Sequence, residues 1–139
     1  MLRAIFALCA GLFAAMIVIT GFELVNSFLV YPPPPGFDFR NAAQVQAFAL
    51  AMPAKALAMV LAGWLLGAFV GGAISARLDT LRPYLPATLV GAFIALGTLL
   101  NARSIPHPEL VVWMGSVLPI PLALLAARLF RRASPAPGI

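Results

Sequence analysis

Hydrophobic residues fall into four long runs, which polar or proline-containing segments separate along the chain. The runs cover about residues 4–30, 55–76, 84–101 and 109–130. A helix rises about 1.5 Å per residue, so about 20 apolar residues cross the ~30 Å hydrocarbon core of a bilayer. The pattern therefore predicts an all-α membrane protein, in which residues 1–139 form a single domain: a four-transmembrane-helix bundle.

The connection between the first two runs, residues 31–53, has structure of its own. It opens with Tyr31, four consecutive prolines and Gly36. Because proline lacks a backbone donor, the first helix must end there. Asn41 followed by Gln44 resembles a helix-capping box and predicts a short helix over residues 41–52, which we expect to lie at the membrane surface.

The last run is interrupted by proline. Pro119 and Pro121 remove backbone hydrogen bonds in the middle of the run and predict a kink in the fourth helix. Residues 133–139, which are rich in proline, alanine and glycine, are predicted to be disordered.

Small residues recur every four positions in three of the runs. The sets are Gly63, Gly67, Gly71 and Ser75 in the second run, Ala87, Gly91 and Ala95 in the third, and Ala7, Gly11 and Ala15 in the first. This spacing, a glycine zipper where glycine dominates, forms a groove into which another helix fits closely. We expect tight packing at these positions, either within one chain or between self-associated subunits.

The composition and the charge distribution support a membrane location. Hydrophobic residues make up 63% of the chain and charged residues 9%, too little polar surface for a soluble domain of this length. The net charge of +5 does not indicate nucleic-acid binding, because the arginines border apolar runs instead of forming a basic patch. Six arginines (Arg3, Arg77, Arg82, Arg128, Arg131 and Arg132) share one side of the predicted bundle, against Arg40, Lys55 and Arg103 on the other. This bias predicts that both termini lie in the cytoplasm. Arginine outnumbers lysine eight to one and alanine is abundant, which is typical of a bacterial sequence, so we expect a bacterial inner-membrane protein.

Polar residues that could bind a ligand gather in the outer half of the predicted bundle. The candidates are Glu23, Asn26, Ser27, Tyr31, Lys55, Asn101, Arg103, His107 and Trp113. Thr20, Glu23 and Ser27 share a helical face, which we expect to point into the bundle because a carboxylate in lipid is costly. Two alternatives remain open for Glu23: a structural ion pair with Lys55, Arg40 or Arg103, or a ligand or proton site.

No pattern in the chain indicates catalysis or metal binding. Cys9 is the single cysteine and His107 the single histidine, which is too few for a transition-metal site. No serine belongs to a recognisable nucleophile motif, so we predict no catalytic residue and no cofactor. His107 is expected to be an exposed turn residue or interfacial anchor, and Asp79 a solvated loop charge.

Several of these features occur together in one order: Glu23, the Tyr31–Gly36 turn, the Gly67–Gly72 stretch, Asn101 and the Ile105–Pro108 turn. In this the chain resembles a group of small bacterial four-helix membrane proteins. The resemblance implies the topology and the outer location of a site, but no activity.

Three functions are compatible with the sequence. We expect a non-enzymatic accessory protein that binds a membrane lipid or a protein partner through its outer polar cluster. The alternative is a small oligomeric transporter or channel that uses Glu23 as a proton or cation site. The third, an enzyme acting on a lipid or quinone, requires Glu23 and His107 to come within hydrogen-bonding distance of each other.

Overall fold

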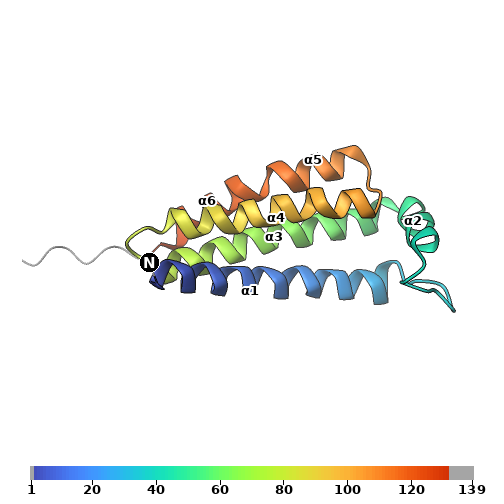
Figure 1. Cartoon of the computed structure of the whole chain (residues 1–139), viewed down its shortest axis with the longest axis horizontal. Coiled ribbons are helices and arrows are strands. Elements are labelled where there is room, and N and C mark those ends of the chain that lie inside the picture. Colours follow the sequence, from blue (N-terminus) through green and yellow to red (C-terminus); the bar gives the residue numbers. More distant parts are fainter. Residues whose placement is uncertain (1, 132–139) are drawn as a thin grey trace, which may run out of the picture.

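The computed structural model describes residues 2–131, and all regular secondary structure in that range is helical (Figure 1). The elements are α1 (Leu2–Val25), the π-helical turn η1 (Asn26–Val30), α2 (Ala42–Leu50), α3 (Ala54–Leu78), α4 (Tyr84–Ser104), α5 (Glu109–Val117) and α6 (Pro119–Phe130). The predicted helical class is confirmed. The predicted disordered tail, residues 133–139, lies outside the described residues.

Four helical rods run side by side, and each is long and apolar enough to cross a membrane (Figure 1). They are α1 with η1, α3, α4, and α5 with α6. The beginning of α1, the α3–α4 loop and the end of α6 lie at one end of the bundle, which we call the Arg3 end. The opposite end, where α2 lies beside the ends of the rods, is called here the proline-turn end.

Small residues hold the helix backbones close together, and these contacts lie within one chain. A Cβ atom added to Gly71 on α3 would lie 2.6 Å from the carbonyl oxygen of Gly11 on α1. Likewise, a Cβ on Gly72 would lie 2.6 Å from the carbonyl oxygen of Ala123 on α6, and one on Gly91 of α4 would lie 2.7 Å from the Cα of Ile120. Glycine is therefore required at these crossings, since no side chain fits between the two backbones.

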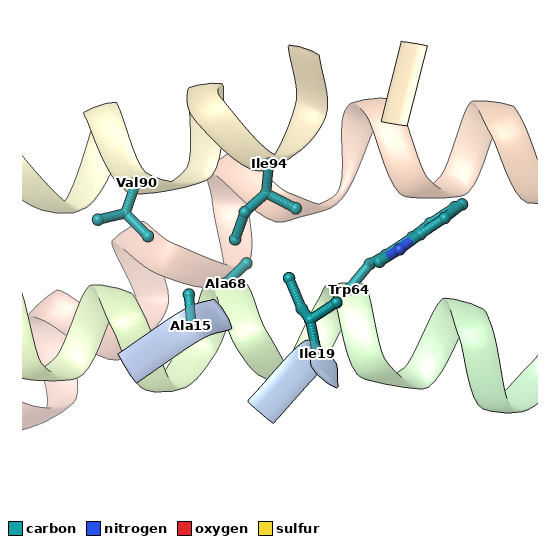
Figure 2. Packing of buried hydrophobic residues seen from close by; sticks show 6 residues of the cluster. All are labelled: Ala15, Ile19, Trp64, Ala68, Val90 and Ile94. Atoms are coloured by element: carbon teal, nitrogen blue, oxygen red, sulfur yellow. The ribbon is translucent and has the colours of Figure 1, made fainter. Parts of the chain in front are cut away.

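The hydrophobic core connects α1, α3 and α4 along their middle. Figure 2 shows its main cluster: Ala15 and Ile19 from α1, Trp64 and Ala68 from α3, and Val90 and Ile94 from α4. Most of these side chains are small or medium-sized. Trp64 is the exception, and its ring packs against Gly115 of α5, where an added Cβ would lie 2.6 Å from the Trp64 Cε3 atom.

The prolines of the fourth rod divide it into two helices. Helix α5 ends at Val117 and α6 begins at Pro119, with Leu118 between them. Pro119 occupies the first turn of α6, where its missing N–H leaves no carbonyl of that helix unpaired. The kink predicted from Pro119 and Pro121 therefore takes the form of a helix break.

The proline segment after η1 ends in a tight turn. The backbone N–H of Phe37 donates to the carbonyl of Pro34 at 3.1 Å, and Gly36 has a φ of 79°. Proline followed by a glycine with positive φ is the arrangement of a type II turn. This turn brings the chain back toward the bundle before α2 begins.

Asn41 caps α2 as its sequence position predicts. Its Oδ1 accepts from the backbone N–H groups of Ala43, at 3.1 Å, and Gln44, at 3.3 Å. The second half of the predicted capping box does not form. The Gln44 side chain instead accepts from the backbone N–H of Asp38, because the Asn41 N–H already donates to the Asp38 carbonyl.

The prediction that Asp79 is a solvated loop charge is wrong. Its side chain is only 3% exposed, and its Oδ1 accepts from the backbone N–H groups of Leu81, at 3.2 Å, and Arg82, at 3.1 Å. A carboxylate that accepts two backbone hydrogen bonds shapes the loop that joins α3 to α4.

Candidate functional site

Two adjoining cavities lie between α1 and α4 in the half of the bundle nearest the proline-turn end. The first, the apolar cavity, measures about 240 Å³ and is lined mainly by Met16, Ile19, Phe93, Ile94 and Gly97. The second measures about 430 Å³ and lies nearer α2. It is called here the polar cavity because Asn26, Ser27 and His107 line it, but most of its lining is apolar and includes Phe37, Phe39, Val45, Phe48 and Met52. Glu23, Trp64 and Asn101 line both cavities, which are therefore direct neighbours; the pair is called here the groove.

Helices α1 and α4 are in close contact toward the Arg3 end of the groove. There, a Cβ on Gly11 would lie 3.1 Å from a Val90 methyl carbon, so the two helices touch. Two turns further along α4, a Cβ on Gly97 would meet no atom within 4 Å. The core cluster of Figure 2 closes the groove on the side of Ala15 and Val90.

Asn26 is a deeply buried polar residue of the polar cavity and is 6% exposed. It is the first residue of η1, and its Nδ2 donates to the carbonyl of Ala56 on α3 at 3.3 Å. The Ala56 carbonyl can only accept a hydrogen bond, so the Asn26 side-chain amide is oriented with Nδ2 toward it. The amide oxygen Oδ1 therefore faces away from Ala56. Within residues 2–131, this Oδ1 is the one fully buried side-chain N or O atom that lacks a hydrogen-bond partner. Single-turn π-helices such as η1 occur frequently at functional sites.

Glu23 lies at the junction of the two cavities without an ionic partner. No lysine or arginine lines either cavity, and Lys55, Arg40 and Arg103 are all exposed. The ion pair with Lys55, Arg40 or Arg103 that we considered from the sequence therefore does not form among these residues. The carboxylate is the single acidic group of the groove.

The face of Thr20, Glu23 and Ser27 does not point into the helix interface, and that prediction is wrong. All three residues are exposed to solvent in the isolated chain. The buried stripe of α1 consists of Ala7, Gly11, Ala15 and Ile19, which pack against α3, and it continues to Asn26. Small residues decide which face packs, because they allow the closest approach of the backbones. Glu23 and Ser27 nevertheless reach the groove from its edge.

His107 and Trp64 form one wall of the polar cavity. The His107 ring is partly buried, not an exposed turn residue, and its centroid lies 5.7 Å from that of Trp64. His107 Nδ1 lies 2.7 Å from the Ile105 carbonyl oxygen, which can only accept, so Nδ1 carries a proton. In the neutral ring, Nε2 is then a hydrogen-bond acceptor.

The structure brings five of the predicted binding residues together and leaves four outside. Glu23, Asn26, Ser27, Asn101 and His107 line the polar cavity. Lys55, Arg103 and Trp113 are exposed and line neither cavity; Trp113 is 68% exposed. Tyr31 belongs to a separate crevice of about 600 Å³ beside α2, where its ring stacks on Phe48 at 4.4 Å. A binding role for any of these residues stays a prediction.

Trp64 is the groove residue that the sequence did not reveal. It lies within an apolar run, where a tryptophan is as consistent with a lipid-facing position as with a site. Its four-residue spacing from Ala68 and three-residue spacing from Leu61 and Gly67 place it on the packed face of α3, which was the available signal. Its importance depends on Gly115 of α5, a contact made by a distant part of the chain.

Two features of the described residues concern metal binding and acid–base chemistry. Within residues 2–131, no group of three or more histidine, cysteine, aspartate or glutamate side chains could hold a metal ion. His107 donates to Ile105 and forms no hydrogen bond with Glu23, the pairing that an acid–base enzyme would need.

Comparisons of this chain with protein-family models, with characterised proteins and with solved structures gave no match.

Proposed function

We propose that this chain is a non-enzymatic, multi-pass protein of a bacterial inner membrane that binds one membrane lipid in the groove between α1 and α4. The observation that carries the proposal is that the apolar and polar cavities adjoin each other and share Glu23, Trp64 and Asn101. A lipid suits this lining, because both cavities are mostly apolar and Asn26, Ser27 and His107 all lie in the one nearer α2. Its tail would lie against Phe93 and Gly97, and its head against Asn26 and His107.

The surface of the bundle supports a membrane location. Large hydrophobic side chains are exposed around the rods; Phe13 is 71% exposed, Leu99 47% and Leu129 61%. A water-soluble monomer rarely exposes an apolar surface of this extent. Basic side chains lie instead at the ends of the rods, where Arg3 donates to the Leu78 carbonyl at 2.8 Å and Arg77 to the Phe130 carbonyl at 3.3 Å. Arginines in these positions suit the headgroup regions of a bilayer.

The packing of the other half favours binding over transport by a single chain. Between the groove and the Arg3 end, Gly11, Ala15, Gly71 and Val90 are all buried and in close contact. A transported ion or molecule would have to pass through this packed region. The alternative of a transporter that uses Glu23 therefore requires either an oligomer or a large rearrangement of the helices.

Lipid binding is tested by native mass spectrometry of the detergent-solubilised protein. We expect one lipid per chain to survive delipidation conditions that strip the remaining lipid, and to rebind with saturation when phospholipid is added back. If the number of lipids bound per chain instead rises with each addition and never saturates, the result would contradict a specific site in the groove.

The proposed topology is tested by cysteine labelling in spheroplasts. Cys9 is the single native cysteine, so Cys9→Ser gives a background for single cysteines at Pro34 and Leu81, which lie at opposite ends of the bundle. A membrane-impermeant maleimide should label Pro34→Cys in intact spheroplasts and Leu81→Cys only after lysis. The reverse pattern would place the termini outside.

A further inference from the structure

The fixed hydrogen-bonding groups of the polar cavity are acceptors. The Glu23 carboxylate can only accept while ionised. The Asn26 Oδ1 is an acceptor, because Nδ2 donates to the Ala56 carbonyl, and it is buried in the wall of the cavity. The His107 Nε2 is an acceptor in the neutral ring, because Nδ1 carries the proton that faces the Ile105 carbonyl. All three residues line the same cavity, and no lysine or arginine lines it with them. The cavity is therefore suited to a group that donates hydrogen bonds and carries positive charge.

Asn26 gives this inference its strongest support. An amide oxygen that is buried without a partner loses its hydration and gains nothing in return. This oxygen has almost no accessible surface, so a donor in the cavity removes that penalty once the Asn26 side chain turns toward it. A quaternary ammonium cannot do so, since it has no N–H group.

Neutral groups complete the cavity on the side of α3 and α4. Asn101 and Trp64 both line it, and the side chain of each carries an N–H donor. Such groups can donate to a phosphate oxygen without bringing a positive charge. The Glu23 carboxylate would repel the negative charge of an anionic lipid without an amine, because no lysine or arginine lines the cavity to offset it.

We propose that the lipid in the groove carries a protonated primary amine in its head group, as phosphatidylethanolamine does, with the ammonium toward Glu23, Asn26 and His107. The phosphate then lies toward Asn101 and Trp64, and one acyl chain occupies the apolar cavity. This inference rests on the proposed lipid-binding function and adds the chemistry of the head group.

The test compares three phospholipids with identical acyl chains on the delipidated full-length protein, by native mass spectrometry. Phosphatidylethanolamine and phosphatidylcholine have the same net charge, but only the first has N–H donors. We expect phosphatidylethanolamine to bind about tenfold more tightly than phosphatidylcholine, as for one charge-assisted hydrogen-bond site. Phosphatidylglycerol is expected to bind no better than phosphatidylcholine.

Two variants connect the preference to the cavity. Glu23→Gln changes an exposed position and leaves the fold intact, and Asn26→Leu replaces the buried amide by a side chain of similar size. Each should reduce the preference for the amine head group to less than about threefold. Glu109→Gln is the matched control, because it removes the same charge at the same end of the bundle but lies outside both cavities; its preference should equal that of the wild type.

The outcomes separate the two proposals. Equal binding of all three lipids, saturable at one per chain, would overturn the amine head group and leave lipid binding standing. Saturable binding of none would overturn both. Free ethanolamine should not displace the bound lipid at the concentration at which phosphatidylethanolamine saturates the site; displacement at that concentration would assign the cavity to a soluble amine and overturn the lipid as its source.

Discussion

Replacement of Gly71 by alanine is expected to lower the free energy of unfolding by about 1–3 kcal/mol, the usual cost of overpacking a tight interface. The added methyl carbon would lie 2.6 Å from the Gly11 carbonyl oxygen, 2.9 Å from a Val90 methyl carbon and 3.0 Å from the Ala15 Cβ. The Gly11 oxygen is a backbone atom and the Ala15 Cβ is bonded directly to the backbone, so neither can move without its helix. The α1–α3 crossing must therefore widen to accommodate the methyl group.

Gly97→Ala and Gly21→Ala are the matched controls. Each adds the same methyl group to a helix, but an added Cβ meets no atom within 4 Å at either position. Because alanine restricts the unfolded chain and favours helix, these two variants should be neutral or more stable by up to about 1 kcal/mol. Reversible unfolding in detergent, followed by circular dichroism, measures all three. A loss of stability in Gly97→Ala equal to that in Gly71→Ala would contradict the role assigned to the α1–α3 crossing.

Replacement of Gly97 by leucine is expected to weaken lipid binding at least about tenfold while the protein stays folded. The leucine side chain would extend into the apolar cavity, which measures about 240 Å³ and has Gly97 in its wall. A tenfold loss corresponds to about 1.4 kcal/mol, comparable to the removal of one or two methylene groups of the acyl chain from the cavity.

Gly21→Leu controls for the added bulk and hydrophobicity in this measurement. Gly21 is exposed on α1 and lines neither cavity. Native mass spectrometry with the same phospholipid should give wild-type affinity for Gly21→Leu and reduced affinity for Gly97→Leu. Equal affinities for the two variants would move the lipid away from the groove.

The sequence was sufficient to predict the features that local chemistry controls. The apolar runs predicted four long helices, and the four-residue spacing of Gly63, Gly67, Gly71 and Ser75 matches positions that are all buried. The Asn41 cap was also predictable, since it depends on residues within three positions of one another. The break at Leu118 follows from the chemistry of proline.

The groove itself was not predictable, because it depends on distances between helices. Nothing in the sequence of α1 indicates that it contacts α4 at Gly11 and Val90 but not at Gly97. The π-helical turn η1 directly follows the last turn of α1, which holds Glu23. No hydrophobic pattern in the sequence distinguishes this turn from a continuing α-helix. Trp64 gained its role only through Gly115, which is far away in the chain.

Five of the nine residues chosen from their polarity nevertheless line the polar cavity. The reason is that polar side chains inside apolar helices are few, and those near one end of neighbouring helices meet whenever the helices are antiparallel. Lys55, Arg103 and Trp113 fell outside because they face away from the α1–α4 groove, a property set by helix rotation.

The most direct test of a lipid in the groove is the fluorescence of Trp64 in bilayers that contain phospholipid brominated in its acyl chains. The chain has two tryptophans, so Trp113→Phe leaves Trp64 as the single emitter. Trp64 is 6% exposed and lines both cavities, whereas Trp113 is 68% exposed outside them. We predict that brominated lipid quenches Trp64 and that adding Gly97→Leu to this variant removes most of the quenching. Trp64 emission that brominated lipid leaves unchanged, while Trp113 is quenched in a Trp64→Phe protein, would contradict the presence of an acyl chain between α1 and α4.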